Sequence, residues 1–336
     1  MNSKIDIVIP WVDGNDIEWL KEKKKYMPEL CIDAADNRYR DWGLLKYWFR
    51  GIEKNASWVN KIYFVTWGHI PSWLNTSNPK LKIIRHEDYM PEEYLPTFNS
   101  NTILSNLYRI KGLSENFVVF NDDLYLISKT KDTDFFINNI PCDNAALNIH
   151  CPKRSESIQN VCFNNAGIIN DYFNFREVIK QNKKIWYNFH NGKELFRTII
   201  LRKSPRFPGF YHHHLPQGYR KETFEKVWKL EFNYLNKVSK NKFRTSEDVN
   251  EWLFKDWQIV EGKIIVRKGK LGKVFHLNDN LMPEQGKEVA DTIKNKKIKC
   301  IAINDCQLTG NKSKQCLESI VSAFEKILPD KSSFEK

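Results

Sequence analysis

The fold follows from one stretch near the start of the chain, Ile5-Asp6-Ile7-Val8-Ile9-Pro10-Trp11-Val12, which is apolar almost throughout. It stops at Asp13-Gly14-Asn15-Asp16, four residues that favour a turn. A continuous apolar run of this kind, bounded by a turn sequence, predicts a buried β-strand. The stretch is therefore typical of a strand in a sheet that is covered on both faces.

Further strands and helices alternate with this one along the first 130 or so residues. Leu44, Leu45, Trp48, Phe49 and Ile52 recur at helical spacing, which predicts an amphipathic helix over 41–54 with Asp41 as its N-cap. A second helix is predicted over 103–113. The remaining predicted strands are 61–66, 81–84 and 117–120. Strands separated by helices favour an α/β fold whose sheet is mostly parallel and flanked by helices.

The pattern loosens after about residue 140. Helices are predicted over 165–183 and 221–240, a short strand over 263–267, and an irregular loop where Pro205, Pro208, Gly209, Pro216 and Gly218 occur. From 284 the chain predicts a helix, a strand (298–303) and a helix (313–328). We therefore expect a core at 1–140, a largely helical insertion with loops at 141–285, and a strand-helix segment at 286–336 that rejoins the core.

Polar segments follow several of the predicted strands. In open parallel sheets, ligands bind beyond the carboxyl ends of the strands. This rule brings together Asp13-Gly14-Asn15-Asp16, Thr66-Trp67-Gly68-His69 and Asn121-Asp122-Asp123, although they lie far apart in the sequence. We therefore expect one ligand site at this edge of the sheet.

The sharpest signal for a metal is Phe117-Val118-Val119-Phe120-Asn121-Asp122-Asp123, an apolar strand that ends in an amide and two carboxylates. Magnesium prefers oxygen ligands and takes one or two carboxylates, which leaves positions for phosphate oxygens. We therefore predict metal ligation by Asp122, Asp123 and Asn121. A solvated turn is an equally weighted alternative for the motif alone, because Asn and Asp are good turn residues.

Asp13 and Asp16 form the second candidate pair. Gly14 between them allows a tight turn or the close approach of a ligand. The alternative is structural, because Asp16 can cap a helix that begins near Ile17.

The third candidate is Tyr211-His212-His213-His214-Leu215-Pro216. A histidine near a metal and an acceptor hydroxyl is suited to general-base work. Adjacent histidines cannot all face the same way, so at most two are expected to share a site. A zinc cluster is the competing interpretation, although no Cys-x-x-Cys or His-x3-His spacing accompanies it. A surface histidine run is the third alternative.

The chain is basic, with 53 Lys and Arg against 41 Asp and Glu, a formal net charge of +12. Because the excess is spread along the chain, most of it is expected to be solvated surface. Arginine forks can clamp phosphates, and we expect about two of six to contact a ligand. The six candidates are Arg38, Arg40, Arg50, Arg109, Arg206 and Arg220.

No apolar run is long enough to span a membrane, and the start of the chain lacks the pattern of a signal peptide. A cytoplasmic protein is therefore expected. Its seven cysteines form no Cys-x-x-Cys pair and are expected to be reduced.

Taken together, these segments resemble the Stealth family of sugar-1-phosphate transferases, defined by short conserved regions in a fixed order. The first region resembles residues 5–16. The second resembles the run from Arg38-Tyr39-Arg40-Asp41 through 45–59, Ile70-Pro71-Ser72-Trp73-Leu74-Asn75 and Leu95-Pro96-Thr97-Phe98-Asn99-Ser100 to Asn121-Asp122-Asp123. The third and fourth are similar to His212-His213-His214-Leu215-Pro216 and Cys300-Ile301-Ala302-Ile303-Asn304-Asp305. Gly43, Leu44, Leu104 and Tyr108 depart from the family pattern.

The resemblance implies a Rossmann-like, GT-A-like sheet and transfer of sugar 1-phosphate from a nucleoside-diphosphate sugar, such as a UDP-hexose or UDP-N-acetylhexosamine. The acceptor would be a glycan hydroxyl in capsular or surface polysaccharide synthesis, and nucleoside monophosphate would leave. It implies Mg²⁺ or Mn²⁺ on Asp122, Asp123 and Asn121.

Roles for the other residues are implied too. Asp13 and Asp16 would orient acceptor or diphosphate. His214 is favoured over His213 as base because the family pattern is His-x-Pro, with Asp16 as the alternative base. The residues implied to bind substrate are Arg38, Arg40, Arg109, Asn304 and Asp305.

Two other functions are weighed. A metal-dependent GT-A-like glycosyltransferase would hold the same donor but release nucleoside diphosphate. A basic protein that binds nucleic acid or membrane without catalysis would need a clustered basic face, and no nucleic-acid motif is found. Peripheral contact with the inner membrane is compatible with catalysis, because a basic surface favours anionic lipid.

Overall fold

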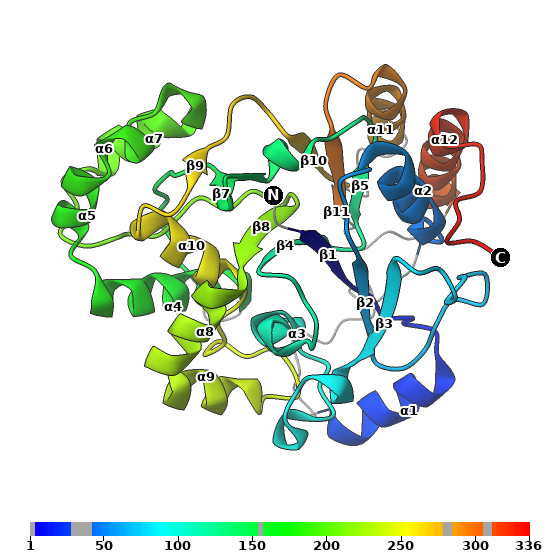
Figure 1. Ribbon diagram of the computed structural model, residues 1–336, viewed down its shortest axis with the longest axis horizontal. Coiled ribbons are helices and arrows are strands. Elements are labelled where there is room, and N and C mark those ends of the chain that lie inside the picture. Colours follow the sequence, from blue (N-terminus) through cyan, green and yellow to red (C-terminus); the bar gives the residue numbers. More distant parts are fainter. Residues whose placement is uncertain (1–3, 28–41, 154–156, 278–283, 305–310) are drawn as a thin grey trace.

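The computed structural model describes residues 4–27, 42–153, 157–277, 284–304 and 311–336. Its centre is a five-stranded sheet with strand order β3-β2-β1-β4-β8 (Figure 1). The first four strands are parallel, and β8 is antiparallel to β4. Their bounds are β1 Ile5–Pro10, β2 Ile62–Thr66, β3 Leu81–Arg85, β4 Asn116–Val119 and β8 Gln217–Arg220. The predicted mostly parallel α/β sheet is confirmed.

Both faces of this sheet are buried because side chains alternate along each strand. Ile7 and Ile9 of β1 belong to a core that also includes α2, α11 and α12. Val8 between them belongs to a second core shared with α8 and α10. Figure 1 shows these two helix groups on opposite sides of the sheet. This double coverage explains why β1, β2 and β4 are apolar almost throughout, whereas the edge strands β3 and β8 include Lys82, Arg85 and Arg220.

The antiparallel strand β8 positions the histidine segment. Val119 of β4 pairs with Gln217 of β8, and Asn116 pairs with Arg220. Because the two strands run in opposite directions, the start of β8 lies at the carboxyl end of β4. Residues just before β8 therefore lie beside residues that follow β4. This topology brings the two predicted site segments together.

A second sheet of three strands has the order β10-β11-β5. Its strands are β5 Leu124–Leu126, β10 Gly272–His276 and β11 Cys300–Asn304. The segment at 286–336 was expected to rejoin the core. Its strand β11 lies outside the five-stranded sheet and pairs with β10 and with β5, which directly follows the Asp122-Asp123 turn. The third sheet contains β6 Phe136–Ile137, β7 Ile140–Asp143 and β9 Ile265–Val266.

Most helices of the described chain lie in the second half, as predicted. They are α1 Ile17–Tyr26, α2 Leu45–Asn55, α3 Ser100–Ser105, α4 Ser157–Tyr172, α5 Phe175–Gln181, α6 Lys183–Trp186, α7 Glu194–Leu201, α8 Lys221–Leu230, α9 Phe232–Ser239, α10 Trp252–Val260, α11 Glu284–Asn295 and α12 Asn311–Ile327. None of the helices described here is both long and apolar enough to cross a bilayer.

Several predicted helix bounds were wrong. The helix predicted over 165–183 breaks where the side chain of Asn174 accepts hydrogen bonds from the backbone N–H groups of Arg176 and Glu177 and starts α5. The cap at Asn174 is a local side-chain contact, which apolar spacing alone does not reveal. The one predicted over 221–240 divides into α8 and α9 at Glu231.

In the first half, Leu44 occupies the N-cap of α2, and Asp41 lies outside the described residues. The helix predicted over 103–113 ends at Ser105, and a 3-10 turn follows.

Candidate functional site

The turns after β1 and β2 are joined by His69. The backbone N–H of Asp13 donates to His69 Nε2 at 2.8 Å, and His69 Nδ1 lies 3.8 Å from Asp16 Oδ2. Burial lowers the pKa of His69, against the opposing charges of Asp16 and Asp13. A neutral imidazole is consistent with a ring nitrogen that accepts from a backbone N–H. Two of the three segments expected at this edge of the sheet are therefore in contact.

Asp13 and Asp16 also have local structural roles. Asp13 Oδ1 accepts from the backbone N–H of Asn15 at 2.9 Å, and Asp16 Oδ1 accepts from that of Trp19 at 2.8 Å. Asp16 is the N-cap of α1, as the structural alternative predicted. Each contact engages one carboxylate oxygen, so capping and ligand binding are compatible.

The most informative contact joins the third segment to the histidine loop. His214 Nε2 lies 2.7 Å from Asp123 Oδ2, although 91 residues separate the two in sequence. Both side chains are about one-quarter exposed. The other oxygen, Asp123 Oδ1, is buried and has no hydrogen-bond partner among the described residues. The two oxygens of one carboxylate thus face different surroundings.

The environments of the neighbouring histidines differ. Burial alone would lower the pKa of His214, but the charge and hydrogen bond of Asp123, aided by Glu251 and Asp122, raise it above its ordinary value. Burial and the charge of Lys255 lower the pKa of His213 to about 4, so its imidazole is neutral near pH 7. His214 is therefore the better proton acceptor of the two.

A small cavity of about 20 Å³ lies beside His214, large enough for about one water molecule. Its lining includes Asn121, His213, His214, Glu251 and Trp252. Burial raises the pKa of Glu251 to about 7, and Glu251 Oε2 has no hydrogen-bond partner within the described part of the chain. Sequence reasoning missed Glu251, because a lone acid in a polar loop carries no spacing signal.

The residues at the end of β4 fit a divalent cation. Asp122 and Asp123 are adjacent carboxylates in the turn that follows a buried strand, and the amide of Asn121 faces the same small cavity as His214. The buried, unpartnered Asp123 Oδ1 is the kind of hard oxygen that Mg²⁺ or Mn²⁺ binds. The predicted ligand set is chemically suited to such an ion.

The predicted substrate-binding residues differ in their position relative to the site. Asn304 ends β11, and its neighbour Ile303 donates its N–H to the backbone oxygen of Asp123 at 3.0 Å, which places Asn304 beside the site. Arg109 stacks on Tyr108 and Trp228 and donates to Asn106. None of these contacts involves Asp123 or His214, so phosphate binding by Arg109 stays a prediction. Arg38, Arg40 and Asp305 lie outside the described residues.

Two other candidate arginines have structural partners. Arg50 forms a two-point ion pair with Glu335, with its Nη2 at 2.7 Å from a carboxylate oxygen, and thereby fastens α2 to the C-terminal segment. Arg220 pairs with Glu115 and Glu222 where β8 meets α8. Both guanidinium groups are therefore engaged in ion pairs within the protein.

Comparison with known proteins decides the family. The Stealth conserved region 1 model matches residues 3–31, and the conserved region 2 model matches 38–142. A capsular polysaccharide phosphotransferase of Streptococcus pneumoniae is 40% identical over 99% of this chain and 98% of its own. The chain belongs to the Stealth family. Other Stealth-like relatives are a receptor polysaccharide phosphotransferase of Streptococcus oralis (39% identical; 99% of both chains) and an exopolysaccharide phosphotransferase of Lactiplantibacillus plantarum (37%; 99% of this chain, 96% of the relative).

The two matched Stealth regions contain the Asp13–Asp16 turn and the Asn121–Asp123 turn. His214 and Asn304 lie outside both matched ranges. The structure nevertheless places them beside Asp123, through the antiparallel pairing of β8 and the end of β11. The candidate site thus contains residues from both halves of the chain.

Proposed function

We propose that this Stealth chain transfers sugar 1-phosphate from a nucleoside-diphosphate sugar to a glycan hydroxyl in capsular or surface polysaccharide synthesis. The observation that carries the proposal is the Asp123–His214 contact, which places a proton acceptor against a carboxylate suited to a cation. The phosphotransferase names of relatives that align over nearly the whole chain support the reaction class. A UDP-hexose or UDP-N-acetylhexosamine is the proposed donor.

Asp122, Asp123 and Asn121 are proposed to hold Mg²⁺ or Mn²⁺. Such an ion, when bound, neutralises negative charge on the donor diphosphate, which is the main requirement of phosphoryl transfer. Asp123 Oδ1 is the oxygen available for this role, because Oδ2 is already bonded to His214.

His214 is proposed to take the proton from the acceptor hydroxyl. Its Nε2 is held by Asp123, which leaves Nδ1 as the nitrogen that can accept a proton. Asp123 thereby orients the ring, as the acid of a catalytic triad orients its histidine. The hydroxyl oxygen then forms a bond to the phosphorus nearest the sugar, and the bond from that phosphorus to nucleoside monophosphate breaks.

Asp13 and Asp16 are proposed to orient the acceptor or the diphosphate, because they follow β1 at this edge of the sheet. Asn304, the last residue of β11, is proposed to bind substrate on the floor of the cleft. Arg38, Arg40, Arg109 and Asp305 remain proposed substrate-binding residues.

The released nucleotide distinguishes this reaction from its alternative. A GT-A-like glycosyltransferase would use the same donor and metal but attack the sugar carbon and release nucleoside diphosphate. We expect purified protein, incubated with UDP-sugars, Mg²⁺ or Mn²⁺ and polysaccharide acceptor, to release UMP, scored by ion-exchange chromatography. Release of UDP as the main product would overturn the proposed reaction in favour of glycosyl transfer.

Peripheral membrane contact is also proposed, and helix α7 supports it. The side chains that α7 buries are Glu194 and Thr198, whereas Phe196 is 70% exposed and Ile200 is 62% exposed. Phe189, in the preceding 3-10 turn, is 75% exposed.

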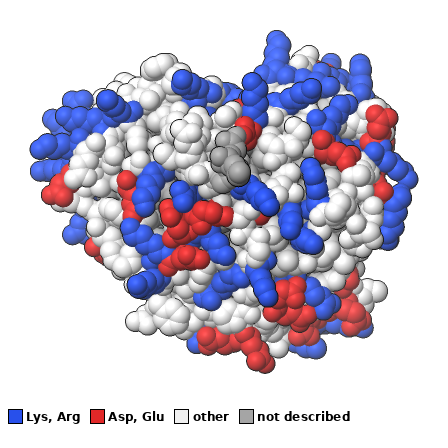
Figure 2. Space-filling model, in the orientation of Figure 1, with Lys and Arg blue, Asp and Glu red and all other residues white. Residues whose placement is uncertain are grey.

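Exposed basic residues flank the helix: Lys183, Lys184, Lys193, Arg202 and Lys203. Figure 2 shows Lys and Arg gathered on the side of the molecule where Figure 1 places these helices. An apolar face rimmed by cations suits the interface of an anionic bilayer.

We expect the protein to co-sediment with phosphatidylglycerol-containing vesicles but not with pure phosphatidylcholine vesicles. Phe196→Ser with Ile200→Ser should weaken this binding by at least about tenfold, because two large apolar side chains no longer enter the interface. Phe232→Ser, at another exposed apolar position on α9 (53%), is the control and should bind like the parent. Equal binding by the double variant, or no binding by the parent, would contradict this role for α7.

A further inference from the structure

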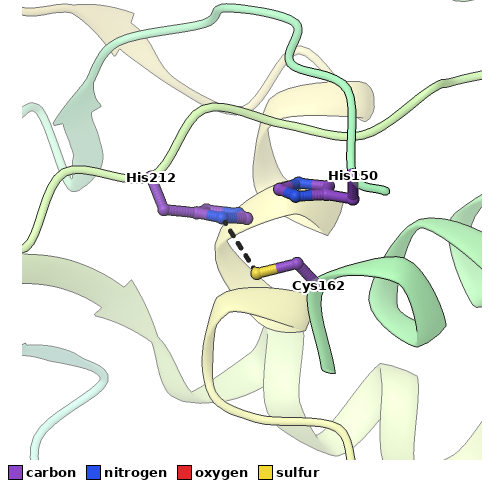
Figure 3. Close-up of side chains that lie close together, drawn as sticks. All are labelled: His150, Cys162 and His212. Carbon is purple, nitrogen blue, oxygen red and sulfur yellow. Dashed lines mark hydrogen bonds between the residues drawn. The ribbon is translucent and has the colours of Figure 1, made fainter. Parts of the chain in front are cut away.

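One cluster of metal-binding side chains lies outside the proposed catalytic site. His150, Cys162 and His212 each offer a ligand atom, and these atoms lie within 4.8 Å of one another (Figure 3). His150 precedes α4, Cys162 lies on α4, and His212 lies in the segment that leads to β8. The three residues are far apart in the sequence and have no Cys-x-x-Cys or His-x3-His spacing, so only the tertiary structure brings them together.

We propose that His150, Cys162 and His212 bind a zinc ion, with a fourth position left for an oxygen ligand. In a tetrahedral site, Zn–N bonds of about 2.0–2.1 Å and Zn–S bonds of about 2.3 Å place ligand atoms about 3.3–3.7 Å apart. Cys162 Sγ and His212 Nδ1 are already 3.8 Å apart. Separations of up to 4.8 Å therefore need to shorten by at most about 1.1–1.5 Å when the ion binds.

The second nitrogen of each ring has the partner that a metal-bound histidine requires. His212 Nε2 lies 2.9 and 3.0 Å from the two carboxylate oxygens of Asp256, and His150 Nε2 lies 3.1 Å from the backbone oxygen of Phe210. Such contacts fix the orientation of a ligand ring and direct its other nitrogen to the metal. Nδ1 is then the ligand atom of both histidines. Zinc would displace the contact between His150 Nδ1 and the side chain of Gln159.

The surroundings hold the cluster in place. Trp252 stacks on the ring of His212 with centroids 4.5 Å apart, and the ring of His150 is nearly parallel to that of His212. Cys162 is 4% exposed and His150 is 8% exposed. Ligands that are buried and oriented before binding lose little freedom when the ion enters.

A catalytic cysteine is the rival interpretation, because Cys162, His212 and Asp256 are linked in the order of a nucleophile, a base and an acid. The burial of Cys162 contradicts it. Reactive thiols need access to substrate, whereas Cys162 is closed off from solvent at 4% exposure. A metal ion small enough to enter a closed pocket is the better occupant.

The proposed zinc would act on the catalytic site through the backbone. His212 lies two residues before His214, so an ion on His212 ties this segment to α4. Zinc would therefore help to hold His214 against Asp123, while remaining distinct from the magnesium-type site on oxygen ligands. This division follows ligand chemistry, since thiolate and imidazole favour zinc and carboxylates favour magnesium.

The full-length protein can be tested directly. After EDTA treatment and addition of ZnCl₂, gel filtration followed by elemental analysis should find about one zinc per chain, retained in excess Mg²⁺. Co²⁺ in place of zinc should give a thiolate-to-cobalt charge-transfer band and the visible bands of tetrahedral cobalt. Zinc should also raise the melting temperature of the metal-free protein.

Variants identify the ligands. Cys162→Ser and His150→Gln should each lose the cobalt band, whereas the control Cys151→Ser, which removes an exposed thiol nearby, should keep it. Asp256→Asn should weaken zinc binding about 10–100-fold, and Asp123→Asn should leave it unchanged. If Cys162→Ser does not fold, the cobalt spectra of the parent and of His150→Gln test the zinc site instead. A folded parent that retains no zinc and shows no thiolate band, or a band that survives Cys162→Ser, overturns the proposal.

Discussion

Asp123→Asn should reduce sugar-1-phosphate transfer by at least about 10³-fold, because it removes the carboxylate proposed to hold the cation and to orient His214. Asparagine has the same shape and can still contact His214 Nε2, so the fold should survive the substitution. Replacing both Asp122 and Asp123 with Ala should abolish turnover. Release of nucleoside monophosphate from the donor, measured with saturating Mg²⁺, provides the readout.

The matched control for this substitution is Asp171→Asn on the exposed surface of α4, which should retain parental activity. Melting temperatures of all variants separate a catalytic loss from unfolding. A folded Asp122→Ala, Asp123→Ala double variant with substantial activity would disprove the metal assignment.

His214→Gln should lower kcat by about 10²–10⁴-fold, the usual contribution of a general base. Glutamine can still hydrogen-bond to Asp123, but it cannot take a proton from the acceptor hydroxyl. His213→Gln should cost less, because His213 has no described hydrogen bond to the proposed metal-binding carboxylates and its imidazole only lines the cavity.

Steady-state rates and donor binding should be measured together for these variants. Loss of kcat with donor binding intact is expected for His214→Gln. His190→Gln serves as a control at a partly exposed histidine in the 3-10 turn before α7. A larger loss in His213→Gln than in His214→Gln would assign the base to His213 and contradict the proposed mechanism.

The sheet was predictable because its strands obey simple rules. Residues 5–12 and 117–120 are continuous apolar runs, and a strand covered on both faces must be apolar on both. Parallel strands end at the same edge, so the Asp13–Asp16 and Asn121–Asp123 turns were expected together without any contact information. The His69 contact with Asp13 agrees with that expectation for the turns after β1 and β2.

Other features escaped prediction for identifiable reasons. The side chain of Asn174 caps the first turn of α5 and so starts a new helix. The spacing of apolar residues gives no sign of such a cap. The contacts of the Arg109 guanidinium with the rings of Tyr108 and Trp228 were not foreseen either, while phosphate binding by Arg109 stays a prediction. Burial raises the pKa of Glu251, against the charge of His214, and that burial follows only from the packing of distant segments. Each outcome depends on neighbours that are distant in sequence.

The sequence by itself determined the strands, their covered faces, the carboxylate turns and the membership in a family, because local apolar patterns and short motifs carry that information. Only the tertiary structure decided which histidine meets which partner. The antiparallel return of β8 beside β4 places His214 on Asp123, and the packing of α4 and α10 around the same segment places His212 between Cys162 and Asp256. Contacts of this kind depend on how the chain folds back on itself, since residues far apart in sequence carry no local signal of their distance in space.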